Sequence, residues 1–268
     1  MNKDTGGYQS NPLVAELYDQ VIPYANRPDI EFFVQAAQDS GGPVLEVGCG
    51  TGRVLLPTAR AGVAITGLDI SKYMLDVCRQ NLAAEPTEVQ ERVTLVEGDM
   101  RDFDLGKTFS LVTTPFRPFQ HLLTTEDQIN CLECIYRHLE PGGFLILDIF
   151  NPSLARLAMD NLGEDHHIEP EFITPDGIKV QRKDRIVARD YFRQVQDVEL
   201  IYYLTHPDGK KERIVHAFPM RYLFRYEAEH LLARCGYEVI ELYSDYHKNP
   251  LGTSYPGELI FLAKKPAT

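Results

Sequence analysis

The sequence has no tryptophan, few cysteines, no long apolar run and no excess of positive charge. Hydrophobic residues make up 44% of the 268 residues and charged residues 25%, a balance typical of folded globular proteins. No run reaches the roughly 18 apolar residues that a membrane span requires, and the first residues lack the apolar segment of a secretion signal. We therefore expect a cytoplasmic α/β protein without a membrane partner.

The formal net charge is -12 at pH 7, and the isoelectric point is about 5.1. Such a chain repels phosphate backbones, so nucleic acid is a disfavoured partner. Residues 181–225 are the exception, with 10 Lys and Arg against 6 Asp and Glu. This local excess is typical of a solvated face, and a basic lid over an anionic small substrate is the alternative.

Five cysteines are an odd number scattered along the chain, which excludes a secreted disulfide framework and favours reduced thiols. Cys131 and Cys134 form a C-x-x-C pair, but apolar residues around them recur with a helical period. No second pair completes a zinc site, so we expect core cysteines and no metal. The adjacent His166 and His167 also give poor tetrahedral geometry, and we expect a loop pair there.

Apolar runs alternate with helical patterns from residue 43 to residue 150, which is typical of a parallel sheet. The predicted strands are 43–47, 63–69, 93–97, 110–114 and 144–149, with helices near 52–61, 71–83 and 126–139. Two helices, near 12–22 and 28–39, precede them. The cluster Glu140-Pro141-Gly142-Gly143 predicts a helix end and a turn into the next strand.

The pattern changes after Asn151-Pro152. Residues 165–224 contain long β-rich segments, and Asp208-Gly209 predicts a hairpin between two of them. We expect an antiparallel meander inserted into, or packed beside, the main sheet. A helix at 226–235 and strands at 237–243 and 258–263 then follow.

A glycine loop follows the first predicted strand, where Gly48, Gly50 and Gly52 alternate with other residues after Glu46. Glycines let the backbone turn sharply and approach a ligand. A phosphate loop is excluded because no Lys-Ser/Thr pair follows, and a nicotinamide or flavin loop would have a third spaced glycine where Arg53 stands. A bare strand-to-helix turn is the alternative without a ligand.

Two acidic residues follow the next two predicted strands. Asp69 ends the second strand, where a carboxylate can accept both hydroxyls of an unphosphorylated ribose. It could instead be the cap of the helix that starts near Ser71. Asp99 lies just past the third strand, where it could meet an adenine edge, and a simple turn former is the alternative.

Taken together, the motifs EVGCGTGR, LDIS, EGDMRDF, TTPF and LEPGGFLILDIF resemble those of class I S-adenosylmethionine-dependent methyltransferases. The resemblance covers about residues 40–150. It implies an α/β fold, a Rossmann-like seven-stranded methyltransferase sheet with helices on both faces and an antiparallel last strand. It also suggests an N-terminal helical cap at 1–40, a Rossmann-like S-adenosylmethionine-binding domain at 41–164 and 225–268, and a β-rich substrate lid insertion at 165–224.

The resemblance also implies a site for S-adenosyl-L-methionine. Glu46 and the three glycines would line the methionine part, Asp69 would hold the ribose, and Asp99 would meet the adenine. Residues 114–116 would flank the sulfonium. The candidate cofactor-binding residues are Tyr18, Glu46, Gly48, Gly50, Gly52, Arg53, Asp69, Ile70, Met74, Gly98, Asp99, Met100, Arg101, Thr114, Pro115 and Phe116.

Outside residues 40–150 the pattern is similar to small-molecule N-methyltransferases of the glycine and amino-sugar types, although the acceptor does not follow from this. His121 could serve as a base or accept a hydrogen bond, or could cap a packed apolar turn. Tyr18 could close over the cofactor or belong to the core. The candidate catalytic residues are His121 and Tyr18, and the candidate acceptor-binding residues are Arg117, Gln120, His121, Tyr222 and Arg225.

Three functions remain open on the sequence. The first is methyl transfer to a small molecule, with nitrogen as the expected acceptor atom. The second is an RNA or protein methyltransferase, which the acidic balance and the absence of a basic appendage disfavour for RNA. The third is a non-catalytic S-adenosylmethionine-binding protein, because fold alone assigns no chemistry. An exposed meander edge could also pair two copies into a homodimer.

Overall fold

The structure is a computed structural model that describes residues 8–9, 11–25, 27–165 and 167–267. Seven strands form its main sheet: β1 (Val44–Val47), β2 (Ile65–Asp69), β3 (Val93–Glu97), β4 (Phe109–Thr114), β5 (Leu139–Phe150), β11 (Glu238–Tyr243) and β12 (Glu258–Lys264). Their order is β11-β12-β5-β4-β1-β2-β3. β12 is antiparallel to both neighbours, and the other pairs are parallel. The predicted seven-stranded Rossmann-like fold is confirmed.

The helices begin and end where the local sequence provides caps and breaks. They are α1 (Pro12–Tyr18), α2 (Ile22–Ala25), α3 (Ile30–Asp39), α4 (Leu55–Arg60), α5 (Lys72–Ala83), α6 (Thr87–Gln90), α7 (Thr125–His138), α8 (Leu154–Leu157) and α9 (Arg225–Arg234), with a 3-10 turn, η1, at Pro118–His121. Thr124 caps α7 by accepting the Asp127 N–H at 3.0 Å. The single helix predicted at 12–22 is wrong in its extent: α1 ends at Tyr18, and α2 begins at Ile22 with Pro23 in its first turn, where a missing N–H is tolerated.

Successive residues of the central strands pack into cores on opposite faces of the sheet, and helices therefore cover both faces. Leu45 and Val112 pack with α7 and α9 on one face. Val44 and Leu111, one position earlier in each strand, pack with α3, α4 and α5 on the other. Burial on both faces produces the continuous apolar runs from which these strands are predicted. Cys131 and Cys134 are free and buried in the first core, as expected.

The segment from Glu140 to Gly143 is the main departure from the predicted elements. It lies inside β5, because α7 ends at His138 and the strand begins at the next residue. Against β4, the register jumps between the pair Phe109–Leu139 and the pair Leu111–Phe144, so residues 140–143 bulge out of the ladder. The turn-forming residues therefore produce a bulge within a strand, rather than a turn before one.

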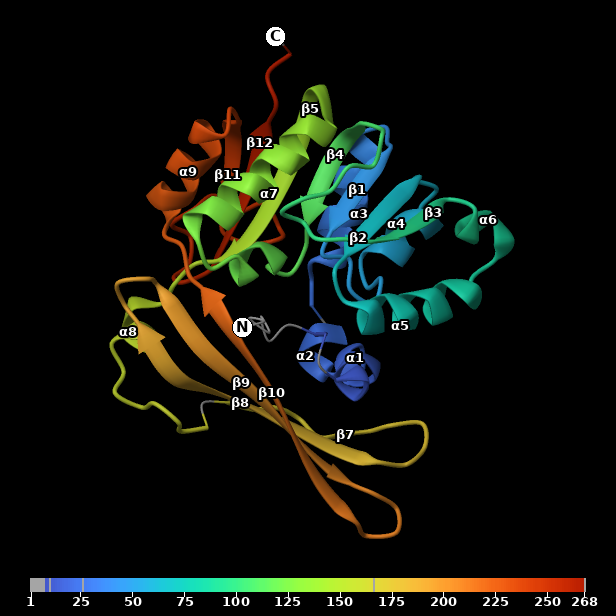
Figure 1. Cartoon of the computed structure of the whole chain (residues 1–268), viewed down its shortest axis with the longest axis vertical. Coiled ribbons are helices and arrows are strands. Elements are labelled where there is room, and N and C mark those ends of the chain that lie inside the picture. Colours follow the sequence, from blue (N-terminus) through green and yellow to red (C-terminus); the bar gives the residue numbers. More distant parts are fainter. Residues whose placement is uncertain (1–7, 10, 26, 166, 268) are drawn as a thin grey trace.

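A second, antiparallel sheet lies apart from the main one (Figure 1). We call it the meander sheet; it contains β6 (His167–Ile168), β7 (Phe172–Ile173), β8 (Lys179–Asp190), β9 (Val195–Thr205) and β10 (Lys211–Arg221). The predicted hairpin at Asp208-Gly209 is confirmed, with Thr205 of β9 opposite Lys211 of β10. Of the predicted histidine pair, His166 lies outside the described residues and His167 begins β6.

Helices α1 and α2 lie between the main sheet and the meander sheet (Figure 1). Val14 and Leu17 of α1 pack with Val180, Leu200 and Tyr202 of the meander sheet in a third core. The first helices therefore join the two sheets and form one wall of the space between them. Within the described ranges, no helix combines the length and the hydropathy needed to cross a membrane.

Candidate active site

A cavity of about 510 Å³ opens at the carboxyl ends of β1 to β4. Gly48 and Gly50 follow β1, Asp69 ends β2, Asp99 follows β3 and Phe116 follows β4. Tyr8, Gln9, Tyr18, Leu68, Ile70, Ser71, Met74, Gly98, Met100, Arg101, Pro115, Pro118, His121, Leu122, Leu123, Thr124, Asp127 and Arg193 complete the lining. β1 lies between β2 and β4, so strand order reverses beside the cavity, where open α/β sheets bind ligands.

The loop between β1 and α4 adopts backbone conformations that require glycine. Gly48, Gly50 and Gly52 have φ values of +76°, +54° and +86°. A Cβ atom on Gly48 would lie 2.5 Å from Cβ of Pro118, and one on Gly52 would lie 2.8 Å from Sγ of Cys78. Side chains are therefore excluded from the glycine positions of the loop by both conformation and space.

Asp69 is fixed at the cavity wall by two backbone hydrogen bonds. Its Oδ2 accepts the Gly50 N–H and its Oδ1 accepts the Ser71 N–H, each at 2.8 Å. Burial raises the pKa of Asp69, while these backbone bonds oppose the shift. Ser71, not Asp69, caps α5, since its Oγ accepts the Met74 N–H at 3.3 Å. The carboxylate thus orders the glycine loop and keeps lone pairs for hydroxyl donors.

Asp99 reaches the cavity from the loop after β3 and is paired with Arg101. The Nε of Arg101 lies 3.0 Å from both oxygens of Asp99, and its Nη1 lies 3.2 Å from Asp127 on α7. Burial raises the pKa of Asp99, but hydrogen bonds from Arg101 outweigh it and the net shift is downward. At this end of the cavity, the Arg101 guanidinium therefore lies between the carboxylates of Asp99 and Asp127.

Glu46 and Arg53 lie outside the cavity lining. Glu46 of β1 is 2% exposed, and its Oε2 has no hydrogen-bond partner. Burial raises the pKa of Glu46 to about 8, although Arg53 opposes the shift. Arg53 binds both oxygens of the fully buried Asp29, at 2.7 and 2.6 Å. Its guanidinium is thus used to hold the chain that enters α3.

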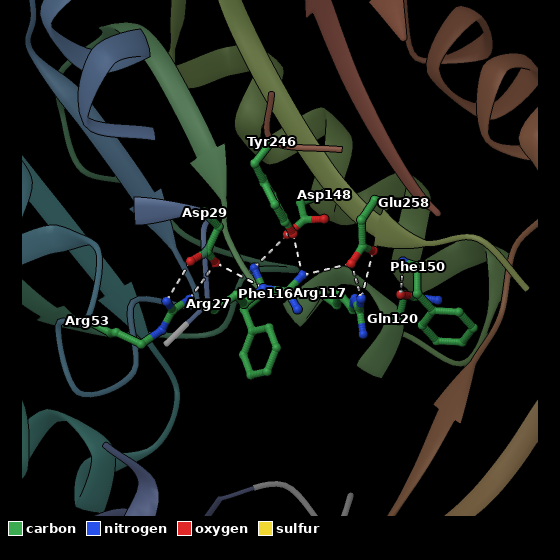
Figure 2. Close-up of polar contacts among 10 residues, drawn as sticks. All are labelled: Arg27, Asp29, Arg53, Phe116, Arg117, Gln120, Asp148, Phe150, Tyr246 and Glu258. Carbon is green, nitrogen blue, oxygen red and sulfur yellow. Dashed lines mark hydrogen bonds and ion pairs between the residues drawn. The ribbon is translucent and has the colours of Figure 1, made fainter. Parts of the chain in front are cut away.

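A line of ion pairs continues from Asp29 along the wall beside Phe116 (Figure 2). Arg27 contacts Asp29 and Glu258, each at 3.1 Å. Arg117 then binds both oxygens of Glu258, at 2.6 and 2.7 Å. These side chains come from the α2–α3 connection, the β4–η1 connection and β12, so the network joins segments far apart in the sequence.

The opposite part of the cavity is aromatic. The ring of Tyr18 lies 5.3 Å from that of Tyr8, 4.9 Å from that of Tyr24 and 6.3 Å from that of Phe116, between centroids. Burial raises the pKa of Tyr18, so the phenol stays protonated at neutral pH. Neutral rings with polar edges can exclude water and still accept or donate a hydrogen bond.

His121 lies at the end of η1, next to the aromatic part of the cavity. Its ring centroid is 5.2 Å from that of Phe218 in β10. Burial lowers the pKa of His121 to about 4. The imidazole is therefore neutral at physiological pH, so one ring nitrogen can accept a hydrogen bond while the other carries the ring's single N–H.

Comparison with known proteins decides the family. Residues 44–143 match the family described as methyltransferase domain. The whole chain is similar to the CcbJ methyltransferase from Streptomyces caelestis, with 25% identity, a TM-score of 0.76 and 100% of each chain covered. This chain is a class I S-adenosylmethionine-dependent methyltransferase.

Two curated relatives of the methyltransferase carry more detailed names. It is 28% identical over 222 residues to the dTDP-3-amino-3,4,6-trideoxy-alpha-D-glucopyranose N,N-dimethyltransferase of Streptomyces venezuelae, covering 81% of this chain and 85% of that one. It is 36% identical over 113 residues to the cypemycin N-terminal methyltransferase of a Streptomyces species, covering 42% and 44%. This second match therefore spans less than half of either chain.

The residues of this methyltransferase fit its cofactor, S-adenosyl-L-methionine. The cofactor has no phosphate, and the N–H groups of the glycine loop are already engaged: those of Gly48 and Cys49 donate to the Leu68 carbonyl, and that of Gly50 donates to Asp69. The unpartnered Oε2 of Glu46 is a buried acceptor just behind the glycine loop. Of the predicted cofactor residues, all line the cavity except Glu46, Gly52, Arg53 and Thr114.

The structure separates the predicted acceptor residues of the methyltransferase. His121 lines the cavity, but Arg117, Gln120, Tyr222 and Arg225 do not. The Gln120 side chain donates to the Arg221 carbonyl at 3.1 Å and accepts the Phe150 N–H at 2.9 Å. Tyr222 is 4% exposed, and Arg225 pairs with Glu229 on the surface of α9. The observed contacts of these residues are with the protein itself.

Several lining residues of the methyltransferase were not predicted. Tyr8 and Gln9 come from the segment before α1, Asp127 from the first turn of α7, and Arg193 from the β8–β9 connection. Thr124 and Asp127 could have been noted, because a Thr followed by acidic residues signals the start of a helix just after the fourth strand. Nothing in the sequence indicates which end of the meander sheet approaches the cavity, so Arg193 had no such signal.

Proposed function

We propose that this methyltransferase transfers a methyl group to a nitrogen atom of a small-molecule acceptor. One observation carries the proposal: a single cavity of about 510 Å³ extends from Asp69 and Asp99 to His121 and Arg193. That volume is within the range of small-molecule sites, roughly 300–1,000 Å³. The similarity to an amino-sugar N,N-dimethyltransferase over most of both chains supports nitrogen as the acceptor atom.

We assign the cofactor end of the cavity to Gly48, Gly50, Asp69 and Asp99. Asp69 would accept the ribose hydroxyls with the lone pairs left free by its two backbone bonds. Asp99 and the neighbouring backbone would meet the adenine, with Arg101 holding the carboxylate in place. Glu46 would face the methionine part from behind the loop. Bound there, S-adenosyl-L-methionine supplies an electrophilic methyl group.

We assign the acceptor end to Tyr18, His121 and Arg193. An amine attacks through its lone pair, so the residues here need to orient it rather than to generate a strong nucleophile. Neutral His121 would accept a hydrogen bond from an acceptor N–H, and the released proton would pass to water because the pKa of His121 is about 4. Holding the reacting atoms in line can contribute about 7–11 kcal/mol to lowering the barrier.

We propose that the meander sheet acts as the substrate lid. Arg193 lines the cavity from the connection between β8 and β9, so this sheet reaches the acceptor end directly. Tyr8 and Gln9 line it from the N-terminal side, next to the helical cap. The lid and the cap would together exclude water from the site once an acceptor has bound.

Binding tests the cofactor end first. Calorimetric titration with S-adenosylhomocysteine should give a dissociation constant in the micromolar range, about -8 kcal/mol of binding free energy. The compound retains the ribose, the adenine and the methionine part, so it probes the assigned contacts. Failure of the purified chain to bind it would refute the proposed site.

Transfer tests the acceptor end. The protein is incubated with tritium-labelled S-adenosylmethionine and a metabolite extract, and the labelled product is identified by mass. Label on the nitrogen of a small molecule is the expected result. Label in bulk tRNA or in protein, or binding without any transfer, would contradict the proposal.

A further inference from the structure

Two consecutive residues at the cavity wall adopt a conformation that side chains rarely tolerate. Phe116 and Arg117 have φ values of +61° and +73°, and neither is glycine. In this turn Phe116 lines the cavity, whereas the Arg117 side chain lies outside the lining and binds Glu258. A left-handed pair of this kind persists only where surrounding contacts impose it.

Asp148 provides such a contact (Figure 2). This residue of β5 is fully buried, and its Oδ2 accepts the Phe116 N–H at 2.9 Å. The same oxygen accepts the hydroxyl of Tyr246 at 3.0 Å, which fixes the carboxylate from the other side. Its Oδ1 is buried and has no partner. The bond to Phe116 is therefore made by an anchored group.

The charge of Asp148 also matters, because guanidiniums surround the Phe116 ring. The guanidinium carbons of Arg27, Arg53 and Arg117 lie 4.7, 5.4 and 5.9 Å from the ring centroid. Three carboxylates belong to the same network. Those of Asp29 and Glu258 pair with these arginines, and that of Asp148 is linked to Arg27 through the Tyr246 hydroxyl. Loss of one carboxylate charge would leave a net positive charge beside the cavity.

We infer that Asp148 is a positioning residue for methyl transfer, which holds Phe116 at the cavity wall and keeps that wall from repelling the cationic sulfonium. This inference rests on the proposed function and on the predicted place of Phe116 beside the sulfonium. Asp148 has no place in the cavity lining, so it acts through Phe116 and through its charge.

The surroundings of Asp148 give this role a pH dependence. Burial raises the pKa of Asp148 to about 6, opposed by Arg117 and Arg27 and assisted by Glu258. Tyr246 also faces the carboxylate, and burial raises the pKa of its hydroxyl, so it stays a neutral donor. Asp148 is therefore ionised at about pH 7.5 and protonated at about pH 5.

The test compares two ligands that differ at the sulfur. S-adenosylmethionine has a cationic sulfonium and S-adenosylhomocysteine a neutral thioether, so the ratio of their affinities isolates the charge at this position. In Asp148→Asn an amide oxygen can still accept the Phe116 N–H, but the charge is gone. At about pH 7.5 we expect this variant to lose about tenfold more affinity for S-adenosylmethionine than for S-adenosylhomocysteine.

The wild-type protein gives a second, independent readout. Its affinity ratio should fall between about pH 7.5 and pH 5 with a midpoint near 6, and the step should vanish in Asp148→Asn. Any step that remains in the variant belongs to other groups such as Glu46, whose raised pKa is about 8. Asp76→Asn, an exposed change on α5, is the matched control and should leave both affinities unaltered.

Three outcomes are decisive. A shift of the ratio in the variant together with the wild-type pH step supports the inference. Equal changes for both ligands, or a wild-type ratio that ignores pH, overturns it while leaving the proposed function intact. Absence of binding by the wild-type protein to either ligand overturns both.

Discussion

The proposed cofactor end and the proposed acceptor end of the cavity are built in different ways. At the cofactor end, Gly48, Asp69 and Asp99 follow strands of one sheet, and backbone hydrogen bonds to the Asp69 carboxylate fix the loop. At the acceptor end, Tyr18 and His121 come from a helix and a 3-10 turn and are held by ring packing. Sheet topology therefore determines the first end, while packing between distant segments determines the second.

The largest expected effect is on the glycine loop. In Gly48→Ala the new Cβ would lie 2.5 Å from Cβ of Pro118 at a φ of +76°, so both overpacking and backbone strain oppose folding. We expect the free energy of unfolding to fall by about 3 kcal/mol in urea titrations. Gly106→Ala is the control, since its φ is +63° but nothing lies within 4 Å of the added Cβ. Equal losses in the two variants would exclude the steric cause.

Asp69→Ala should have the next largest effect. The change removes the acceptor of the Gly50 and Ser71 N–H groups and the proposed partner of the ribose. We expect S-adenosylhomocysteine to bind about a hundredfold more weakly in calorimetry. Asp76→Ala, on the exposed side of α5, should bind it as the wild type does. An Asp69 variant with unchanged affinity would remove the ribose assignment.

The variant His121→Ala should slow methyl transfer without weakening cofactor binding. Removing one hydrogen bond to a neutral imidazole should slow methyl transfer by about tenfold in the tritium assay. The affinity for S-adenosylhomocysteine should stay within about twofold of the wild type, since no cofactor contact is assigned to His121. The pH profile should show no step from His121 above about pH 5, because its pKa is near 4. Loss of cofactor binding in this variant would mean that the two ends are not distinct.

Asp127→Ala should have the smallest effect. Its ion pair with Arg101 is partly exposed and 3.2 Å long, and Arg101 keeps its bonds to Asp99 without it. Such pairs contribute about 0–1 kcal/mol, so S-adenosylhomocysteine affinity should change less than about threefold. A larger loss, measured by the same titration, would show that Asp127 contacts the ligand rather than merely restraining Arg101.

The cofactor end could be predicted because its signals are local. A buried strand followed by spaced glycines, or by one acid, identifies a strand end, and parallel strands bring their ends to the same edge. Asp69 and Asp99 accordingly line the same cavity. The same logic failed at Glu140 to Gly143, since turn residues cannot reveal whether a ladder continues beyond them.

The acceptor end could not be predicted because its side chains meet only through tertiary packing. Tyr222 and Arg225 are candidates on the sequence, yet Tyr222 is buried outside the cavity lining and Arg225 pairs within its own helix. Arg193 reaches the cavity only because the meander sheet packs on α1, a contact between residues far apart in the chain. The type of a side chain does not indicate which distant segments pack together, so it could not show that Arg193 lines the cavity.

The position of β12 has a consequence for how the protein is made. This strand lies between β5 and β11, both of which precede it in the sequence. The gap in the sheet can close only after residues 258–264 have left the ribosome. Glu258, the first residue of that strand, is also the shared partner of Arg27 and Arg117. During synthesis, the network beside Phe116 thus cannot be completed before β12 has emerged.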